Sequence, residues 1–360
     1  MSLSVGIVGL PNVGKSTLFN ALLKRQAALA ANYPFATIDP NIGIVPVPDA
    51  RLEVLAKMVS AKAIKPAVVE FVDIAGLVSG ASKGEGLGNK FLANIRETDL
   101  ICHVVRGFSD DLILREGSTD PKSDREVIEM ELLLADITTL EKQRQPKATK
   151  DKDLLFKWEV VQKMLKVAID GQMISSALAS DEEKKVGREM GLLTAKEIIY
   201  IINVDENVIS EQDSQIKNYA DLLSVSEDKI VIISAKIESE IAALADEDSA
   251  LFLEELGLKK SGLERLIQTA YDRLGLQTYL TAGEMEVKAW TIKKGTLAPQ
   301  AAGVIHTDFE KKFIKAKVVS YQDFLDFDGW KGTKEKGKQR IEGKDYEMRA
   351  DDVVEFMIGT

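Results

Sequence analysis

Short apolar runs rich in β-branched residues alternate along the chain with longer stretches whose apolar positions recur every three or four residues. Continuous apolar runs of this length are typical of parallel strands buried on both faces, and the longer stretches are typical of amphipathic helices. Five such runs occupy residues 3–8, 68–73, 100–105, 198–202 and 229–233. The pattern therefore predicts an α/β fold with a doubly wound sheet.

A long helical segment interrupts this alternation between the third and the fourth run. Two apolar stripes with helical spacing lie on either side of Pro146. The stripes are Val127, Met130, Leu133, Leu134, Ile137 and Leu140, and then Leu154, Trp158, Val161, Leu165 and Ala168. They predict an inserted helical hairpin of coiled-coil type over residues 121–195. Its tip, residues 142–152, holds five cations and one acid, a composition that suits a phosphate backbone.

The last part of the chain has a strand-like pattern of its own. Apolar and polar residues alternate in segments 286–292, 313–319 and 351–358. The segment 331–344 between them holds six cations and two acids. We therefore expect three domains. Residues 1–120 and 196–277 form the first, residues 121–195 form the inserted hairpin, and residues 278–360 form the third.

The composition narrows the function classes. Lys and Arg number 47 against 57 Asp and Glu, and the resulting formal charge of −10 argues against a chain that coats nucleic acid along its whole surface. The single cysteine, Cys102, excludes a disulfide framework within the chain and a Cys-rich zinc module. No apolar run reaches the roughly 20 residues of a membrane span, and the first residues lack a secretory signal. We expect a cytoplasmic protein with no membrane partner.

The first apolar run leads directly into a glycine-rich loop. Residues 9–17 contain G-x-x-x-x-G-K-S, the phosphate-binding loop, and an amphipathic stretch follows. The glycines let backbone N–H groups approach a polyphosphate, Lys15 adds positive charge, and the Ser16 hydroxyl is the expected Mg²⁺ ligand. The predicted nucleotide-binding residues of this loop are Asn12, Val13, Gly14, Lys15, Ser16 and Thr17.

A second apolar run ends in the acid that such a site requires. Asp73 and Gly76 form D-x-x-G, and we expect Asp73 to hold Mg²⁺ through water while the Gly76 N–H meets the γ-phosphate. Thr37, in the loop between the two motifs, is the expected second protein ligand of Mg²⁺. The glycines that follow Gly76 predict a switch loop that the γ-phosphate orders.

Two later loops carry the residues that recognise a base. GTPases place N-K-x-D here, and its Asp accepts two hydrogen bonds from guanine. In this chain the four residues are Asn203-Val204-Asp205-Glu206. Glu206 is one methylene longer than Asp, which misplaces the guanine contact, so we expect weakened guanine selectivity and use of adenine. Ser234, Ala235 and Lys236 form the last loop beside the base.

These motifs occur together in one known family. The chain resembles the YchF-type Obg-like ATPases over essentially its whole length, through residues 9–16, 32–37, 73–77, 203–206 and 301–309. The resemblance implies that ATP is preferred to GTP and that the chain binds the ribosome. The pattern of residues 278–360 is similar to the TGS domain, a ubiquitin-like β-grasp. The expected partners are the large ribosomal subunit and its rRNA, contacted through the hairpin tip and the TGS domain.

The catalytic group is the least defined part of the predicted site. Many GTPases place Gln after D-x-x-G, whereas this chain has Leu77, so we expect slow intrinsic hydrolysis. Similar family members often have a His in a later loop whose nearest counterpart here is Arg115, which stabilises charge but is no base. Asn12 resembles the Asn of potassium-activated relatives, which makes K⁺ a second candidate cofactor. The candidate catalytic residues are Lys15, Asp73, Gly76 and Arg115.

Two alternative functions stay open at this point. One is a GTP-preferring GTPase of the Obg class. The other is a nucleotide-gated binding switch with negligible turnover in the absence of a partner, which the apolar Leu77 favours. Affinities for ATP and GTP, and phosphate release with and without ribosomes, separate these alternatives.

Overall fold

The chain forms two compact units. The computed structural model describes residues 3–30, 41–74, 86–109, 120–147 and 150–359. The first unit consists of Met1–Val45 and Val69–Thr269, and the second consists of Pro46–Val68 and Ala270–Thr360. Within the described ranges, none of the helices combines the length and the apolar composition needed to cross a bilayer.

A six-stranded sheet forms the centre of the first unit, in the order β2-β4-β1-β5-β6-β7. Its strands are β1 (Leu3–Gly9), β2 (Ile42–Pro46), β4 (Val68–Asp73), β5 (Leu100–Arg106), β6 (Glu197–Asn203) and β7 (Ile230–Ile233). β1 pairs in parallel with β4 and β5, and β6 pairs in parallel with β5 and β7. The five apolar runs are strands of this one sheet, which confirms the α/β prediction.

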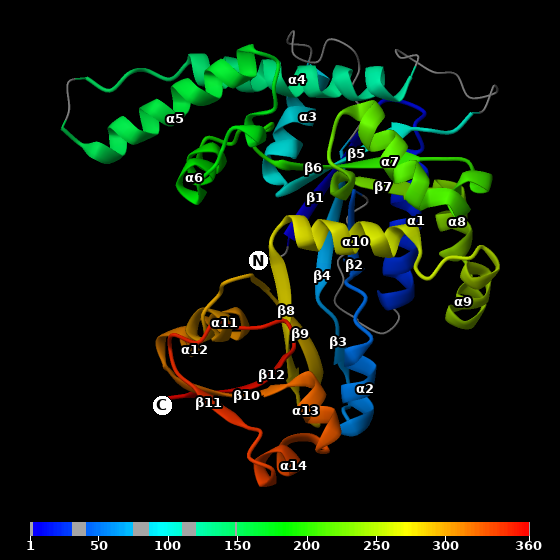
Figure 1. Ribbon diagram of the computed structural model, residues 1–360, viewed down its shortest axis with the longest axis vertical. Coiled ribbons are helices and arrows are strands. Elements are labelled where there is room, and N and C mark those ends of the chain that lie inside the picture. The colour runs from blue at the N-terminus through cyan, green and yellow to red at the C-terminus, as the bar shows by residue number, and fades with distance from the viewer. Residues whose placement is uncertain (1–2, 31–40, 75–85, 110–119, 148–149, 360) are drawn as a thin grey trace. The chain divides into compact units, whose positions relative to one another are not determined.

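Helices accompany this sheet, and α5 and α6 project away from it (Figure 1). They are α1 (Lys15–Ala30), α3 (Gly86–Glu97), α4 (Pro121–Glu141), α5 (Lys152–Ile169), α6 (Asp181–Glu189), α7 (Gln212–Leu223), α8 (Ala235–Ile241), α9 (Asp246–Glu255) and α10 (Gly262–Arg273). Short 3₁₀ turns are η2 (Ile174–Ser176), η3 (Glu206–Glu211) and η4 (Glu227–Lys229). Side-chain caps define several helix starts: the Asp120 carboxylate accepts from two backbone N–H groups at the start of α4.

The parallel pairing brings the carboxyl ends of the strands to one edge of the sheet. Ile7 lies opposite Asp73, and Arg106 lies opposite Asn203. The segments that follow β1, β5, β6 and β7 therefore begin next to each other. In open α/β sheets this edge is where ligands bind.

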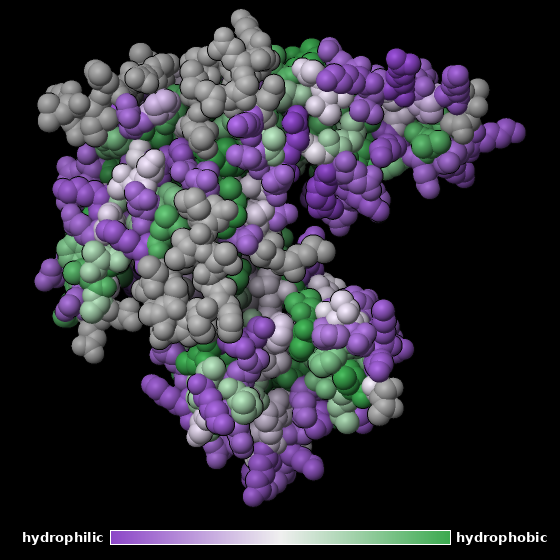
Figure 2. All heavy atoms as spheres, turned by 180° about the vertical axis from the view of Figure 1, so that it is seen from behind, coloured by the Kyte–Doolittle hydropathy of each residue, from purple (hydrophilic) through white to green (hydrophobic). Residues whose placement is uncertain are grey.

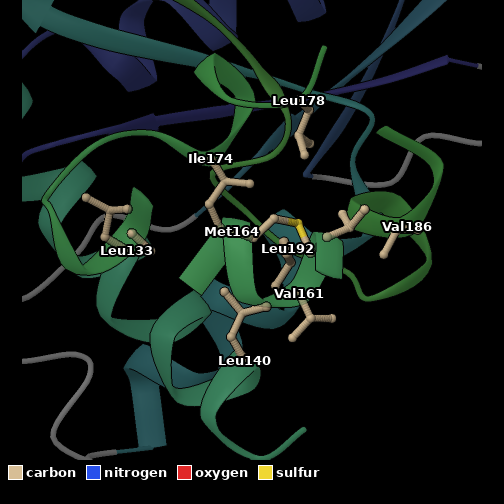
Figure 3. Packing of buried hydrophobic residues seen from close by; sticks show 10 residues of the cluster. Leu133, Leu140, Val161, Met164, Ile174, Leu178, Val186 and Leu192 are labelled. Carbon is tan, nitrogen blue, oxygen red and sulfur yellow. The ribbon is translucent and has the colours of Figure 1, made fainter. Parts of the chain in front are cut away.

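α4 and α5 pack together as a helical hairpin. Leu133 and Leu140 of α4 share a buried apolar cluster with Val161 and Met164 of α5 (Figure 3). α6 and the segment before β6 add Ile174, Leu178, Val186 and Leu192 to the cluster. The hairpin therefore has an apolar core of its own beside the sheet.

Three positions of the predicted stripes are exposed instead of packed in this core. Met130, Leu134 and Leu154 are exposed by 52%, 41% and 47%. α4 contacts β5 and α7 as well as α5, and its Ile128 and Leu132 are buried outside the hairpin cluster. A helix covered on two sides buries positions that a single-stripe pattern does not select.

A second six-stranded sheet forms the centre of the second unit, in the order β11-β10-β12-β8-β9-β3. Its strands are β3 (Ile64–Lys65), β8 (Leu276–Ala282), β9 (Val287–Lys293), β10 (Phe313–Ser320), β11 (Arg340–Glu342) and β12 (Asp352–Ile358). The helices are α2 (Arg51–Met58), α11 (Ala298–Ile305), α12 (Thr307–Lys311), α13 (Tyr321–Asp326) and α14 (Gly329–Glu335). α11 and the strands β8, β10 and β12 enclose a core centred on Tyr279.

Residues 46–68 belong to this second unit although they stand early in the chain. β3 pairs in parallel with β9, and the Arg51 guanidinium donates to Thr278 Oγ1 at 3.1 Å. The domain boundaries expected from the sequence assign this segment to the nucleotide-binding domain, whereas the structure groups it with the C-terminal sheet. A strand of two residues is too short to show an alternation of apolar and polar positions, so the sequence does not predict β3.

Candidate nucleotide-binding site

The glycine-rich loop connects β1 to the first turn of α1. Gly14 has φ +95°, and a Cβ at this position would lie 2.1 Å from the Nδ2 atom of Asn203. At Gly9 a Cβ would lie 2.9 Å from the Val104 carbonyl oxygen. Both positions therefore require glycine, Gly14 for its backbone conformation and Gly9 for close packing. The loop presents Lys15, Ser16 and Thr17 at the start of α1, where backbone N–H groups favour an anion.

The Lys15 ammonium forms an ion pair with the Asp73 carboxylate at the end of β4. Their side chains are only 11% and 21% exposed. A largely buried ammonium needs a charged partner, because transfer of a lone charge from water into the protein is costly. The pair places the acid of D-x-x-G next to the phosphate-binding loop.

The side chain of Asn203 joins two loops of the site. Its Nδ2 donates to the Val13 carbonyl oxygen at 2.9 Å, and its Oδ1 accepts from the Ala235 N–H at 2.9 Å. The residue is buried, and both ends of its amide are occupied. Asn203 therefore positions the phosphate-binding loop and the Ser234–Lys236 loop against each other. Its neighbour Val204 is also buried, and its N–H donates to the Ile233 carbonyl oxygen.

Glu206 and Lys236 form an ion pair at the mouth of the site. Their side chains are 46% and 70% exposed, so solvent screens this pair. The hydrogen bond that Lys236 donates to the Glu206 carboxylate raises the pKa of the Lys236 ammonium. The carboxylate that the sequence analysis assigned to base recognition is thus held by a cation from the neighbouring loop.

Phe108 and Ser109 also line the site, and the sequence analysis did not identify them. The Arg106 guanidinium lies 4.3 Å from the centre of the Phe108 ring. The Ser109 N–H donates to Asp205 Oδ2 at 3.0 Å, which attaches this segment to the segment Asn203–Glu206. The two residues directly follow β5, so the rule that ligands bind at the carboxyl ends of parallel strands was the available signal.

These loops surround one cleft of about 910 Å³. Eleven of the predicted residues line it: Asn12, Gly14, Lys15, Ser16, Thr17, Asn203, Val204, Glu206, Ser234, Ala235 and Lys236. Val13 is buried and contributes its carbonyl oxygen to the Asn203 contact. Thr37, Gly76, Leu77 and Arg115 lie outside the described residues.

The residues present suit a magnesium ion. Mg²⁺ prefers oxygen ligands and retains several waters, so a protein supplies it with few groups besides the substrate phosphates. The exposed Ser16 side chain lies at the start of α1, and the Asp73 carboxylate contacts Lys15, the residue before it. A hydroxyl and a carboxylate therefore stand beside the phosphate-binding loop.

Two family models match the chain. Residues 4–140 match the family described as "50S ribosome-binding GTPase". Residues 276–359 match the family YchF-GTPase_C, described as "Protein of unknown function (DUF933)".

Proteins named "Ribosome-binding ATPase YchF" are similar to the chain over nearly its whole length. The protein of Bacillus subtilis is 50% identical and that of Haemophilus influenzae is 51% identical, each with 99% of both chains covered. A solved structure, titled "Structure of the Schizosaccharomyces pombe YchF GTPase", has a TM-score of 0.86 and 37% identity. It covers 99% of this chain and 98% of its own.

Proposed function

This chain belongs to the YchF family, and from that premise we propose that it is a ribosome-binding ATPase that hydrolyses ATP slowly. One observation carries the proposal. A single cleft joins a phosphate-binding loop to a base-recognition loop in which Val204 and Glu206 replace the Lys and Asp of GTPases. Its volume of about 910 Å³ is within the usual range for small-molecule sites.

The phosphate end of the cleft accounts for triphosphate binding. Lys15 exchanges its contact with Asp73 for the β- and γ-phosphates, and the amides at the start of α1 add further donors. Ser16 and Thr37 would hold Mg²⁺, and Asp73 would hold it through a water molecule. When bound, the ion would neutralise charge that develops on the transferred phosphoryl group.

The base end of the cleft accounts for a preference for ATP. Because both ends of the Asn203 amide bind the protein, we expect Glu206 rather than Asn203 to read the purine. Its longer side chain and its contact with Lys236 both move the carboxylate away from the position that a guanine-reading Asp would occupy. The apolar Val204 and the ring of Phe108 line the same cleft and suit the faces of a purine.

Parallel calorimetric titrations with MgATP and MgGTP test this proposal. We expect wild-type protein to bind ATP more tightly. The double substitution Glu206→Asp and Val204→Lys restores the GTPase pattern and should raise the preference for GTP. Val204→Ala is the matched control, because it changes the same buried position without restoring a cation. Tighter GTP binding by the wild type would favour a GTP-preferring enzyme of the Obg class.

Turnover requires a group that replaces the missing Gln. Leu77 offers no polar atom, and we propose that Arg115 and a K⁺ ion beside Asn12 supply positive charge to the transferred phosphoryl. Asn12 lines the cleft with φ +62°. Phosphate release should be faster in KCl than in NaCl at equal ionic strength, and Asn12→Ala should remove this difference. Equal wild-type rates in the two salts would exclude the K⁺ part of the proposal.

The partner is the ribosome, as the names of the relatives state for those proteins. We propose that the chain contacts rRNA of the large subunit in the cytoplasm through the hairpin tip and the second unit. In the second unit, β12 pairs in parallel with β8, and the strand order is β9-β8-β12-β10-β11. With α11 following the β8–β9 hairpin, this order supports a TGS-type β-grasp. The packing of α4 on α5 supports a coiled-coil hairpin.

A further inference from the structure

The start of α5 carries three consecutive exposed apolar side chains. Leu154, Leu155 and Phe156 are exposed by 47%, 42% and 40%. Trp158, one half-turn further along, already packs against the hairpin core, but Phe156 does not. In the view from behind, the projecting part of the helical hairpin is largely hydrophilic, and a small hydrophobic patch lies near its outer end (Figure 2). Because consecutive positions of a helix point about 100° apart, these three side chains lie around the first turn of α5 and each is open to a partner that approaches the tip.

Cations surround this apolar patch. Lys142, Arg144, Lys147, Lys150 and Lys152 are all exposed. Among the described residues, none of these five forms an ion pair, whereas Lys157 and Lys163 further along α5 pair with Glu189 and Glu183. Two cations of α5 are thus paired with acids, whereas the five cations at the turn have no ion pair among the described residues. On a chain with a net charge of −10, this placement favours a polyanion as the partner.

The combination of features selects one kind of polyanion. Lysines bind phosphates of any nucleic acid, but exposed aromatic and aliphatic side chains gain from contact with unstacked bases. Inside an A-form duplex the bases are paired and the major groove is too deep and narrow for side chains to read. Loops and bulges of RNA present both phosphates and splayed bases.

We propose that the hairpin tip and the first turn of α5 together bind unpaired RNA. The described residues of this site are 142–147 and 150–156. A base stacks on Phe156, and the five cations hold phosphates. This inference rests on the proposed ribosome binding and specifies the RNA that the tip recognises. Leu155, the adjacent exposed apolar side chain, offers the base further apolar surface. Duplex RNA satisfies only the cations and therefore binds the tip less tightly.

Fluorescence anisotropy with the full-length protein tests the inference. The probes are a labelled single-stranded RNA of about 16 nucleotides and the same strand annealed to its complement. We expect the single strand to bind more tightly. Phe156→Ala should weaken single-strand binding by about tenfold and leave duplex binding unchanged, and Phe156→Trp should restore it. Met130→Ala is the matched control, because Met130 is an exposed apolar residue elsewhere on the hairpin.

The cations are tested by the salt dependence of the same binding reaction. Replacing Lys147 and Lys150 with Gln should reduce the slope of log K against log salt concentration by about 1.4, since each contact to a single strand contributes about 0.7. Lys163→Gln removes a cation that is already paired with Glu183 and should leave the slope nearly unchanged. An unchanged slope in the double variant would overturn the role of the cations.

Other results separate this inference from the proposed function. If wild-type protein does not co-sediment with ribosomes, the ribosome proposal fails, whatever the oligonucleotides show. If it does co-sediment but binds duplex as tightly as single strand, or if Phe156→Ala leaves single-strand binding intact, only the inference about the tip fails. A Phe156→Ala protein that loses ribosomes but keeps RNA binding would indicate that the tip contacts ribosomal protein, which also overturns the inference.

Discussion

At the scale of single residues, the loops of the cleft hold one another in position. Asn203 is the clearest case: the sequence motif suggests contact with a base, but the structure shows its amide bound to Val13 and Ala235. Asp205, the variable position of the same motif, accepts from the Ser109 N–H. The motif selects residues that line the cleft, but the partners of each side chain depend on contacts between segments far apart in the sequence.

The contact of Asp205 with Ser109 predicts a specific effect on ATP binding. Asp205→Ala removes the acceptor that holds the segment carrying Phe108, and we expect ATP affinity to fall by roughly 2- to 12-fold, which corresponds to the about 0.5–1.5 kcal/mol of one ordinary hydrogen bond. Asp205→Asn retains an acceptor oxygen and should bind ATP nearly as well as wild type. Calorimetry with MgATP and with magnesium tripolyphosphate distinguishes a defect at the base end of the cleft from a general defect. Tripolyphosphate lacks the base, so a defect at the base end should leave its affinity unchanged. Equal losses for both ligands would indicate a general structural defect instead.

His103 predicts how stability depends on pH. The ring is fully buried in β5, and neither of its nitrogens has a hydrogen-bond partner among the described residues. Burial lowers its pKa from 6.5 to about 4, with Glu129 opposing and Arg125 adding to the shift. The folded pKa lies below the unfolded value, so this stabilising contribution is present above about pH 6.5 and is lost as the pH falls toward 4.

We expect the free energy of unfolding to fall by about 2 kcal/mol between roughly pH 7 and pH 5, because His103 takes up a proton in the unfolded chain. His103→Phe keeps the ring packed against Tyr200 but removes the titration. Urea unfolding of both proteins at the two pH values measures the effect. The wild type should lose more stability on acidification than the variant, and parallel losses would show that other groups account for the pH dependence.

At the scale of elements, the pattern of the sequence predicted the strands well and the hairpin less well. β5 and β7 are buried along their whole length, so their apolar runs are continuous and easily recognised. α4 is buried on two sides, and its buried set includes the polar residues Glu129 and Asp136. A single-stripe pattern cannot select such positions, because polar residues enter a core only where a particular partner receives them.

Asp136 is such a residue, and it fixes the hairpin to the start of β6. Its carboxylate accepts from the backbone N–H groups of Leu193 and Thr194 at 2.8 and 2.7 Å, and from the Thr194 hydroxyl at 2.7 Å. Asp136→Ala leaves three buried donors without an acceptor and should destabilise the fold by about 3–5 kcal/mol. Asp136→Asn retains part of the acceptor capacity and should cost less.

Hydrogen exchange locates this effect. Amides of residues 192–195 should lose protection in Asp136→Ala, while amides of β1 should change little. Asp151→Ala is a matched control, because Asp151 caps α5 at the exposed end of the same hairpin and accepts from Asp153 and Leu154. Unchanged protection at residues 192–195 would contradict the assigned role of Asp136.

At the scale of the whole molecule, the chain contributes to the second unit twice. Residues 46–68 supply α2 and β3, and the remainder follows from residue 270. The sequence predicted a separate β-rich C-terminal region, because its alternation differs from the runs before it. It did not predict the early contribution, since β3 has two residues and its pairing with β9 is not local.

This arrangement predicts that the C-terminal fragment alone is incomplete. A chain of residues 270–360 lacks β3 and α2, and so exposes the edge of β9, where the Val287 N–H otherwise donates to the Ala63 carbonyl oxygen. Unpaired strand edges promote aggregation, and the lost contacts of Arg51 lower stability further. A linked chain joins residues 46–68 to residues 270–360 through a flexible linker of about 20 residues. This linked chain should be more soluble than the chain of residues 270–360 alone, and it should unfold at a higher temperature. Arg51→Ala in the linked form should reverse part of that gain, whereas equal melting temperatures of the short and linked forms would mean that the second unit folds without its early segment.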